Sequence, residues 1–470
     1  MTHRAHVAFL VPAIRLSGGI NVVMEHARNL VHCHGYRVSI VVTAQESQPA
    51  WAFDQLADVT VARSDELDGT EFDLAIATFW DTVPHLWRVP AKRQAYFAQS
   101  IEDRFYELGA AERSLARMTY LLGLPVITEA SWIADTLAAI PDHAPIYYAR
   151  NGISKGVFGP IPEHPPVHDG PLRILIEATD AWYKGLDDSL DTIRRMQCDK
   201  VVTVVGSSPL RADRLRDVNV VHEPMPQAQL RDVYATQHLM LKHSRVEGMY
   251  GPPLEGFHAG MTVVTTPVTG HDEYITHGWN GMLIDWDDPS GNARMLDLLA
   301  TDRRLLEFLR TNALSTARLW PDWPQASEFF ASAVAAILER PSTAQFALLR
   351  DIHEDARTSI EANAAYTHSV KEKLLHTDLH AQKLDALVAE TSNALHRQRV
   401  LTEEERLGRD LLAERLVEVT RQLDALEQSR WLKVLSALER PARLVRPGLG
   451  SVRGRVQAAA RTARTARDAG

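Results

Sequence analysis

Residues 244–260 read SRVEGMYGPPLEGFHAG, and this stretch decides how the whole chain is interpreted. Two glutamates, Glu247 and Glu255, stand eight positions apart and flank a turn rich in glycine and proline. Pro253 suits the first position of a helix, where its missing N–H is not needed. The start of such a helix presents unpaired N–H groups and partial positive charge to an anion such as a diphosphate. The stretch therefore predicts a ligand site at a helix N-terminus.

The two carboxylates indicate what kind of ligand this site binds. The glycines allow the backbone to approach a ligand closely. An ionised glutamate accepts strong, charge-assisted hydrogen bonds from adjacent sugar hydroxyls. The alternative is a capped surface helix with two solvated acids, and the complete pattern favours the binding site over it.

Short apolar runs alternate with helix-length segments over most of the chain. They lie at residues 7–11, 38–42, 74–77 and 126–127, and again at 172–176, 201–205, 218–221, 238–241 and 262–265. This rhythm is typical of parallel sheets with helices on both faces. At 470 residues the chain also exceeds what one hydrophobic core usually supports. The fold class that follows is α/β, with two Rossmann-like domains that face a cleft.

Composition along the chain sets the expected domain boundaries. Five prolines between residues 159 and 171 resist both helix and sheet and mark a linker. We expect an N-terminal Rossmann-like domain at 1–153, a linker at 154–171, a second Rossmann-like domain at 172–340, a helical and partly coiled-coil extension at 341–428 and a basic amphipathic tail at 429–470.

The extension is predicted to be helical because no proline interrupts it. Only Gly408 disturbs the segment between Pro341 and Pro441, and an unbroken helix there would reach on the order of 145 Å. Apolar residues repeat at spacings of 4, 3, 4 and 3 at Leu412, Leu416, Val419, Leu423 and Leu426. This seam predicts a coiled coil over about 400–428, through which the chain would form a homo-oligomer. The alternative is a helix packed on the chain's own surface.

Charge is distributed unevenly. Residues 429–470 hold ten Lys or Arg against two acids, a balance of +8, which leaves −17 for the rest of a chain whose net charge is −9. Trp431, Val434, Leu435 and Leu438 share one helical face beside these cations. Such a helix suits an anionic membrane surface. A disordered tail and adventitious nucleic-acid affinity are the alternatives, and no specific nucleic-acid partner is expected.

The number and spacing of the cysteines favour a protein of a reducing compartment. Cys33 and Cys198 lie far apart, so neither a disulfide framework nor a zinc site is indicated. No run approaches the roughly 20 apolar residues that span a bilayer. We therefore expect a cytoplasmic protein, attached peripherally to the inner face of the cell membrane through its tail.

No metal or other cofactor is expected. The sequence Asp285-Trp286-Asp287 spells the D-x-D pattern of metal-dependent glycosyltransferases, but it follows an apolar strand at a place where a turn is the stronger prediction. The histidines lack a spacing typical of metal ligands.

Several of these segments together resemble one family. The stretch at 244–260 is similar to the E-x7-E signature of the large retaining glycosyltransferase family with the GT-B fold, which includes many bacterial mannosyl-, glucosyl- and rhamnosyltransferases. Further similar segments are Ser17–Gly19, Asn151–Ile153 with Phe158, Val263–Thr266, Gly270–Ile275 and His277–Ile284. The resemblance covers about residues 5–339 and stops before the helical extension.

The resemblance implies roles for individual residues. Glu247 would contact hydroxyls of the transferred sugar, and Glu255 the ribose of the nucleotide. Ligands of parallel sheets bind beyond the carboxyl ends of the strands, which is where the family's glycine loop lies. The resemblance implies further donor contacts for Gly18, Gly19, Met249, Tyr250 and Gly251.

The leaving diphosphate needs cations, and here the sequence departs from the family. Residues 176–185 occupy the place of its G-R-x4-K-G stretch, in which both cations neutralise the departing phosphate. Lys184 matches the lysine, whereas Thr179 stands where the arginine is expected. Thr179 would therefore lie at the donor. Either another cation, such as Arg150 or Arg245, compensates, or the chemistry is weakened.

Another segment resembles rhamnosyltransferase-like members. Residues 96–102 are similar to a Y-F-x-Q-x-x-E stretch, which points to a deoxyhexose donor, although Gln99 and Glu102 would equally hold a loop together. The family's N-terminal histidine is not evident, and residues 77–81 fill its place.

Taken with the resemblance, the residues predict a retaining glycosyltransferase. It would move a hexose or deoxyhexose from a nucleotide-diphosphate sugar to a glycan or lipid-linked acceptor in bacterial cell-surface polysaccharide synthesis. Glu247 and Lys184 would be the catalytic residues, with the donor phosphate itself helping to accept the acceptor's proton. The alternative is a catalytically degenerate scaffold of the same fold that acts through its coiled coil.

Overall fold

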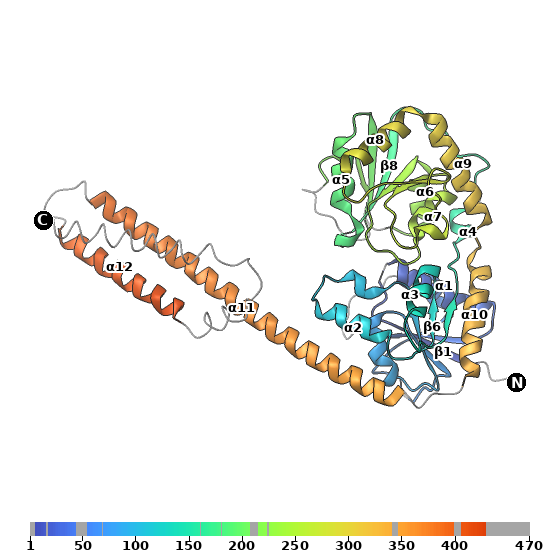
Figure 1. Ribbon diagram of the computed structural model, residues 1–470, viewed down its shortest axis with the longest axis horizontal. Helices are drawn as coiled ribbons and strands as arrows, with labels where there is room; N and C mark the ends of the chain where they lie inside the picture. Colours follow the sequence, from blue (N-terminus) through green and yellow to red (C-terminus); the bar gives the residue numbers. More distant parts are fainter. Residues whose placement is uncertain are drawn as a thin grey trace. The chain divides into compact units, whose positions relative to one another are not determined.

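The computed structural model describes residues 5–15, 17–43, 54–67, 69–159, 161–179, 181–206, 215–222, 225–340, 346–398 and 406–428. The chain divides into two compact units, Met1–Thr358 and Ser359–Gly470. The first unit holds two sheets in separate lobes (Figure 1). The basic tail predicted at 429–470 lies outside the described residues.

The first sheet is parallel and covered by helices. Its strands are β1 (His6–Val11), β2 (Arg37–Val42), β3 (Thr60–Arg63), β4 (Leu74–Ala77), β5 (Gln94–Ala98), β6 (Val126–Thr128) and β7 (Ile146–Tyr148), in the order β3-β2-β1-β4-β5-β6-β7. The helices of this part are α1 (Gly18–His32), α2 (Ala111–Thr119) and α3 (Ser131–Ala138), whereas α4 (Lys155–Phe158) follows β7 and places Phe158 in the core of the second sheet. Every residue of β1 is buried, since both faces of the sheet are covered, and this explains its continuous apolar run.

The second sheet repeats this plan. Its strands are β8 (Leu172–Ala178), β9 (Lys200–Gly206), β10 (Val220–His222), β11 (Leu239–Lys242), β12 (Thr262–Thr265) and β13 (Gly281–Leu283), in the parallel order β10-β9-β8-β11-β12-β13. The helices are α5 (Leu186–Arg195), α6 (Gln227–Ala235), α7 (Gly251–His258), α8 (Pro289–Thr301) and α9 (Arg303–Leu319). Two Rossmann-like domains, as predicted, are confirmed.

The last helix of the first unit returns to the first domain. Although α10 (Trp323–Glu339) lies in the segment 172–340 that the sequence grouped with the second domain, its residues Phe330, Val334 and Ile337 join the core built on β1 and α1. Figure 1 shows α10 running beside that lobe. The ring of His26 on α1 stacks on Phe330 at 4.2 Å between centroids. Helix α10 therefore belongs to the first core by its packing.

Each sheet has one switch point, and the loops at these two switch points hold the candidate site. The strand order reverses between β1 and β4 in the first sheet and between β8 and β11 in the second. Open parallel sheets bind ligands beyond the carboxyl ends of the strands at such a switch point. The loops that follow β1, β8 and β11 carry most of the residues singled out from the sequence.

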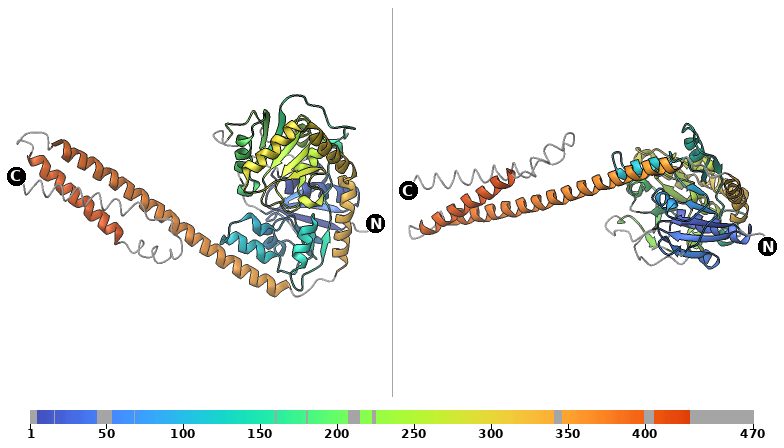
Figure 2. Two further views of the ribbon diagram at one scale, coloured as in Figure 1. Left: turned by 45° about the horizontal axis from the view of Figure 1, so that its top comes forward. Right: turned by 90° about the horizontal axis from the view of Figure 1, so that it is seen from below.

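The extension consists of two described helices, α11 (Phe346–Gln398) and α12 (Arg406–Glu427), rather than one unbroken helix. Within the second unit, α11 buries a stripe at spacings of 3, 4 and 3, and α12 buries Leu416 and Val419 of the predicted seam. The α11 stripe consists of Ala381, Leu384, Val388 and Thr391. Figures 1 and 2 show α12 alongside the C-terminal half of α11. Among the described residues, no helix is long and apolar enough to cross a membrane.

Candidate functional site

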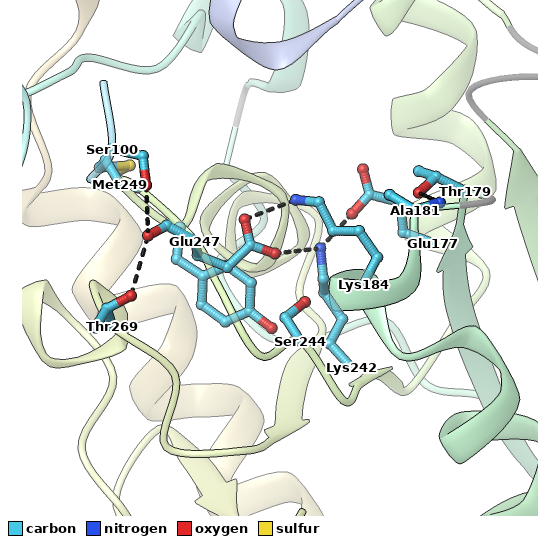
Figure 3. Close-up of polar contacts among 12 residues, drawn as sticks. Ser100, Glu177, Thr179, Ala181, Lys184, Lys242, Ser244, Glu247, Met249 and Thr269 are labelled. Carbon is cyan, nitrogen blue, oxygen red and sulfur yellow. Dashed lines mark hydrogen bonds and ion pairs between the residues drawn. The ribbon is translucent and has the colours of Figure 1, made fainter. Parts of the chain in front are cut away.

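Glu247 lies in the loop after β11, and its carboxylate is enclosed by cations. Its Oε2 accepts a hydrogen bond of 2.7 Å from Lys184 Nζ, and its Oε1 is 3.6 Å from Lys242 Nζ (Figure 3). The residue is only 6% exposed. Among the described residues, Oε1 has no hydrogen-bond partner. The site therefore holds a buried acceptor oxygen that faces one ammonium group and accepts no hydrogen bond from the described residues.

Electrostatics keep this carboxylate ionised. Burial raises the pKa of Glu247, but the ammonium groups of Lys184 and Lys242 lower it by more, so that the pKa lies below its ordinary value. An ionised carboxylate accepts hydrogen bonds and donates none. Oε1 is therefore suited to a hydroxyl donor, which is the role that the sequence assigned to Glu247.

The conformation of the turn that contains Lys184 fixes the position of this residue. The loop after β8 starts with Thr179, whose Oγ1 accepts a hydrogen bond of 3.1 Å from the Ala181 N–H. It ends at Gly185, which has a φ of +66°. A Cβ on Gly185 would lie 2.2 Å from the carbonyl oxygen of His243, so only glycine fits. Lys184 is thus held near the carboxyl end of β8, whereas Thr179 accepts a hydrogen bond within the loop.

The same loop rests on the first domain. Tyr183 stacks on the Phe105 ring at 5.1 Å between centroids, and Trp182 Nε1 donates a hydrogen bond of 3.2 Å to the Phe105 carbonyl. Because Phe105 follows β5 in the first domain, the position of Lys184 depends on contact between the two domains.

Lys242 is the member of the site that sequence reasoning missed. It ends β11 and is 2% exposed, and its Nζ contacts Glu177 Oε2 as well as Glu247. Leu239 pairs with Ile174 in the sheet, so three residues further along each strand Lys242 and Glu177 lie opposite one another. The available signal was a lysine at the carboxyl end of an otherwise apolar strand.

Glu255 occupies α7, as expected, in a different environment from Glu247. It is half-buried, and its Oε1 accepts a hydrogen bond of 3.2 Å from Gln227 Nε2. Burial and the negative charge of Glu177 raise the pKa of Glu255 to about 8, with Lys242 and Gln227 acting in the opposite direction. At neutral pH the carboxyl group is therefore mostly protonated in this structure, and it can both donate to and accept from a ligand hydroxyl.

The resemblance implied that the turn between the two glutamates contacts the donor, but two of its residues bind other parts of the protein in this structure. The Met249 N–H, expected to face the donor, instead donates a hydrogen bond of 3.0 Å to Glu129 Oε1 of the first domain. The Tyr250 side chain is fully buried, and its hydroxyl lies 2.7 Å from Thr265 Oγ1. Gly251 opens α7, and a Cβ there would meet nothing within 4 Å. Of the three residues, Gly251 has open space beside its Cα.

The first domain touches this turn from the loop after β5. A Cβ on Gly248 would lie 1.9 Å from the carbonyl oxygen of Gln99, so the two backbones meet without room for a side chain. Ser100 Oγ donates a hydrogen bond of 3.4 Å to the Glu247 carbonyl, and Trp132 Nε1 one of 3.1 Å to the Gly248 carbonyl. The carboxyl edges of the two sheets therefore face each other at Glu247.

The glycine pair of the first domain starts α1 at the other switch point. Ser17 caps this helix by accepting a hydrogen bond of 3.2 Å from the Ile20 N–H. Gly18 has open space, and a Cβ on Gly19 would lie 3.1 Å from Gln99 Oε1, a buried oxygen for which no partner is found among the described residues. The contact of Gly18 and Gly19 with the donor's diphosphate stays a prediction.

Residues 173–302 match the family described as glycosyl transferases group 1. This range contains the whole Lys184–Glu247–Glu255 constellation. No curated protein sequence matches the chain significantly.

Solved structures share the GT-B fold of the group 1 glycosyl transferases. Sucrose-phosphate synthase from Thermosynechococcus elongatus has a TM-score of 0.61 at 13% identity, over 71% of this chain and 99% of that one. The HepE protein of Anabaena, in complex with UDP and glucose, has a TM-score of 0.57 at 14% identity, over 71% and 100%. The lipopolysaccharide outer core galactosyltransferase WaaB has 0.53 at 14%, over 70% and 99%. At these identities the likeness establishes the fold.

Neither arginine that could replace the family's cation faces Glu247. Arg150 lies over the Trp320 ring at 4.6 Å and donates a hydrogen bond of 3.1 Å to the Tyr148 hydroxyl. Arg245 pairs with Asp188 and Asp287, each at 3.4 Å. Both candidates from the sequence are therefore engaged elsewhere.

Two further motifs have structural explanations. Glu102 is buried and accepts hydrogen bonds from the Tyr96 hydroxyl at 2.7 Å and the Trp80 N–H at 2.6 Å, so it holds a loop together. Asp285 Oδ1 accepts a hydrogen bond of 2.8 Å from the Asp287 N–H, which makes D-x-D a turn, as the sequence favoured. In the described ranges, no group of three His, Cys, Asp or Glu residues is arranged to hold a metal ion.

Glu129 predicts a pH dependence of stability. Burial raises its pKa to about 7, although hydrogen bonds from Asn151 and Met249 act in the opposite direction. Because the folded state then binds a proton more tightly than the unfolded state, this group stabilises the fold fully below its unfolded pKa of about 4.5, and that stabilisation, up to about 3 kcal/mol, is lost as the pH rises through about 7. The variant E129Q lacks this dependence. Glutamine is the neutral counterpart of the protonated carboxyl group, so the free energies of unfolding of the two proteins, measured between about pH 5 and pH 8, should be closest at low pH and diverge as the pH rises through about 7. Parallel curves would contradict the prediction.

Proposed function

We propose that the protein is a retaining glycosyltransferase that moves a hexose or deoxyhexose from a nucleotide-diphosphate sugar to a glycan or lipid-linked acceptor. The observation that carries the proposal is the ionised, buried Glu247, whose Oε1 accepts no hydrogen bond from the described residues, set beside Lys184 and the start of α7. These groups provide an acceptor for sugar hydroxyls and positive charge for a diphosphate within one site.

The residues divide the work of the reaction between them. Glu247 orients the sugar through a hydroxyl. Lys184, which is 25% exposed, leaves Glu247 and stabilises the charge that grows on the departing diphosphate, together with the N-terminus of α7. In a retaining reaction on one face of the sugar, the leaving phosphate oxygen accepts the acceptor's proton, so the protein needs no separate base. Contact between the domains excludes water and limits hydrolysis of the donor.

The donor and acceptor classes draw support from structural neighbours. HepE is bound to UDP and glucose, and WaaB acts on the lipopolysaccharide outer core. Both agree with a nucleotide-sugar donor and a cell-surface glycan. We propose that no metal ion is essential, since Lys184 and a helix N-terminus supply the positive charge.

The test is release of nucleoside diphosphate from a panel of UDP-, GDP- and dTDP-sugars, with product configuration assigned by NMR. Turnover of one donor with an unchanged anomeric configuration supports the proposal, and an inverted product contradicts retention. Thermal stabilisation by a nucleoside diphosphate without turnover of any donor would support the scaffold alternative, which Thr179 at the arginine position and the long extension favour.

The extension and tail carry a second, separate prediction. We propose that they provide an oligomer contact and attachment to the anionic inner face of the membrane. Truncation after residue 428 is expected to abolish salt-sensitive binding to vesicles that contain anionic lipid, because about 1 kcal/mol is lost for each basic residue near the headgroups. Sedimentation of the full chain and of the truncated chain with such vesicles checks this, with neutral vesicles as the control. Equal binding by both chains would reject the attachment. The mass of the full chain in solution tests the oligomer.

A further inference from the structure

Four charged side chains meet at the carboxyl ends of β8 and β11. They comprise two lysines and two glutamates, so their charges balance, and they are Lys184, Lys242, Glu177 and Glu247 (Figure 3). Lys242 lies between Glu177 and Glu247, and Lys184 lies on the other oxygen of Glu247. Glu247 therefore has two counter-charges in the absence of a ligand.

The two lysines differ in their freedom to move. Lys184 ends a short 3-10 helix, Trp182–Lys184, and a quarter of its side chain is exposed, so it can turn toward a ligand. Lys242 belongs to a strand, is 2% exposed, and has its Nζ 5.0 Å from the centre of the Tyr250 ring. Glu177, Glu247 and the Tyr250 ring surround its Nζ and hold it at the end of the strand. Lys242 is thus a fixed charge and Lys184 a mobile one.

We propose that Lys242 is a positioning residue, which keeps Glu247 ionised and in place when Lys184 turns to the donor's diphosphate. This inference rests on the proposed function. It assigns the second cation beside Glu247 to a strand end of the same sheet, whereas Arg150 and Arg245 are engaged elsewhere.

Charge balance gives the physical reason. Burial alone raises the pKa of a carboxyl group, so a Glu247 deprived of both lysines would take up a proton and lose its charge-assisted bond to the sugar. Lys242 remains charged because Glu177 and Glu247 raise its pKa against the opposite effect of burial. The titratable groups that interact with Glu247 are Lys184, Lys242, Tyr183, Tyr250 and Tyr274, with Glu177 beyond Lys242. Of these, Lys242 is the cation that stays when Lys184 leaves.

The experiment compares K242M, which keeps the length but removes the charge, with K242R, which restores it. In K242M, the carboxyl carbon resonance of Glu247, assigned through its loss in E247Q, should titrate at least about one pH unit higher than in the wild type. The acid limb of kcat/KM should move with it, and kcat should fall at least roughly tenfold at low pH, with K242R close to the wild type. Affinity for the nucleoside diphosphate, measured by calorimetry, should change little, because Lys184 and α7 are intact.

The outcomes separate this inference from the proposed function. If K242M titrates like the wild type, or if K242R is as impaired as K242M, the role of Lys242 is rejected. If no donor is turned over, the proposed function fails, while the resonance of Glu247 still decides the role of Lys242. If K242M does not fold, the double variant K242M/E177Q removes the cation together with one carboxylate, and the same upward shift of Glu247 is expected there.

Discussion

Replacement of Glu247 by glutamine is expected to lower kcat by about 10²–10³-fold, or about 3–4 kcal/mol, a magnitude typical of the loss of one preorganised group at a reacting centre. Glutamine keeps the shape of the side chain but removes the charge that orients the sugar. Its amide would also place hydrogen-bond donors near two ammonium groups, Lys184 and Lys242. Initial rates of nucleoside diphosphate release give the measurement.

The matched control is E328Q on α10, because Glu328 is exposed and far along the chain from the site. It should turn over like the wild type. Binding of the nucleoside diphosphate alone should survive in E247Q, since Glu247 is assigned to the sugar. Turnover in E247Q within twofold of the wild type would refute that assignment.

Replacement of Gly248 by alanine is expected to reduce kcat/KM by roughly 10²-fold, because displacement of reacting groups by about 1 Å costs that much. The added methyl group would lie 1.9 Å from the carbonyl oxygen of Gln99, so the turn before α7 and the loop after β5 would have to separate. Glu247 is the preceding residue and would move with the turn. Steady-state kinetics with the preferred donor measure the loss.

Gly156 offers the control for this substitution. A Cβ there meets nothing within 4 Å, and G156A is expected to retain wild-type kinetics. If G248A and G156A behave alike, then the contact between Gly248 and Gln99 is not needed for turnover. Comparable melting temperatures of both variants would show that the effect is local to the site.

Local sequence was sufficient for those strands that are buried on both faces. The runs at 74–77 and 262–265 coincide with β4 and β12, and those at 7–11 and 38–42 are each one residue short of β1 and β2. Strands β3 and β7 were missed because they are short and partly exposed, so they lack a continuous apolar run. The strand β5 was interpreted only as a motif, Y-F-x-Q-x-x-E, although it is a central strand.

The candidate site was predictable where one short segment carries the geometry. Two local features carried this prediction: the turn and helix from Glu247 to Glu255, and the Lys184–Gly185 pair. In both, the spacing of residues along the chain is enough to place the backbone from which the side chains extend. The place of α10 and the partner of the Met249 N–H were not predictable in this way, because the first core and Glu129 lie far away in the sequence.

By itself, the sequence determined the two parallel-sheet domains, the helix that starts at Gly251 and the place of Glu247 in the turn before it, because strand periodicity, turn chemistry and capping act over a few neighbouring residues. Only the tertiary structure decided which cations reach Glu247. Arg150 and Arg245 are held by other partners, whereas the register of β8 and β11 places Lys242 opposite Glu177 and beside Glu247. Ion pairing depends on distance in space, and that distance is set by how strands far apart in the chain align.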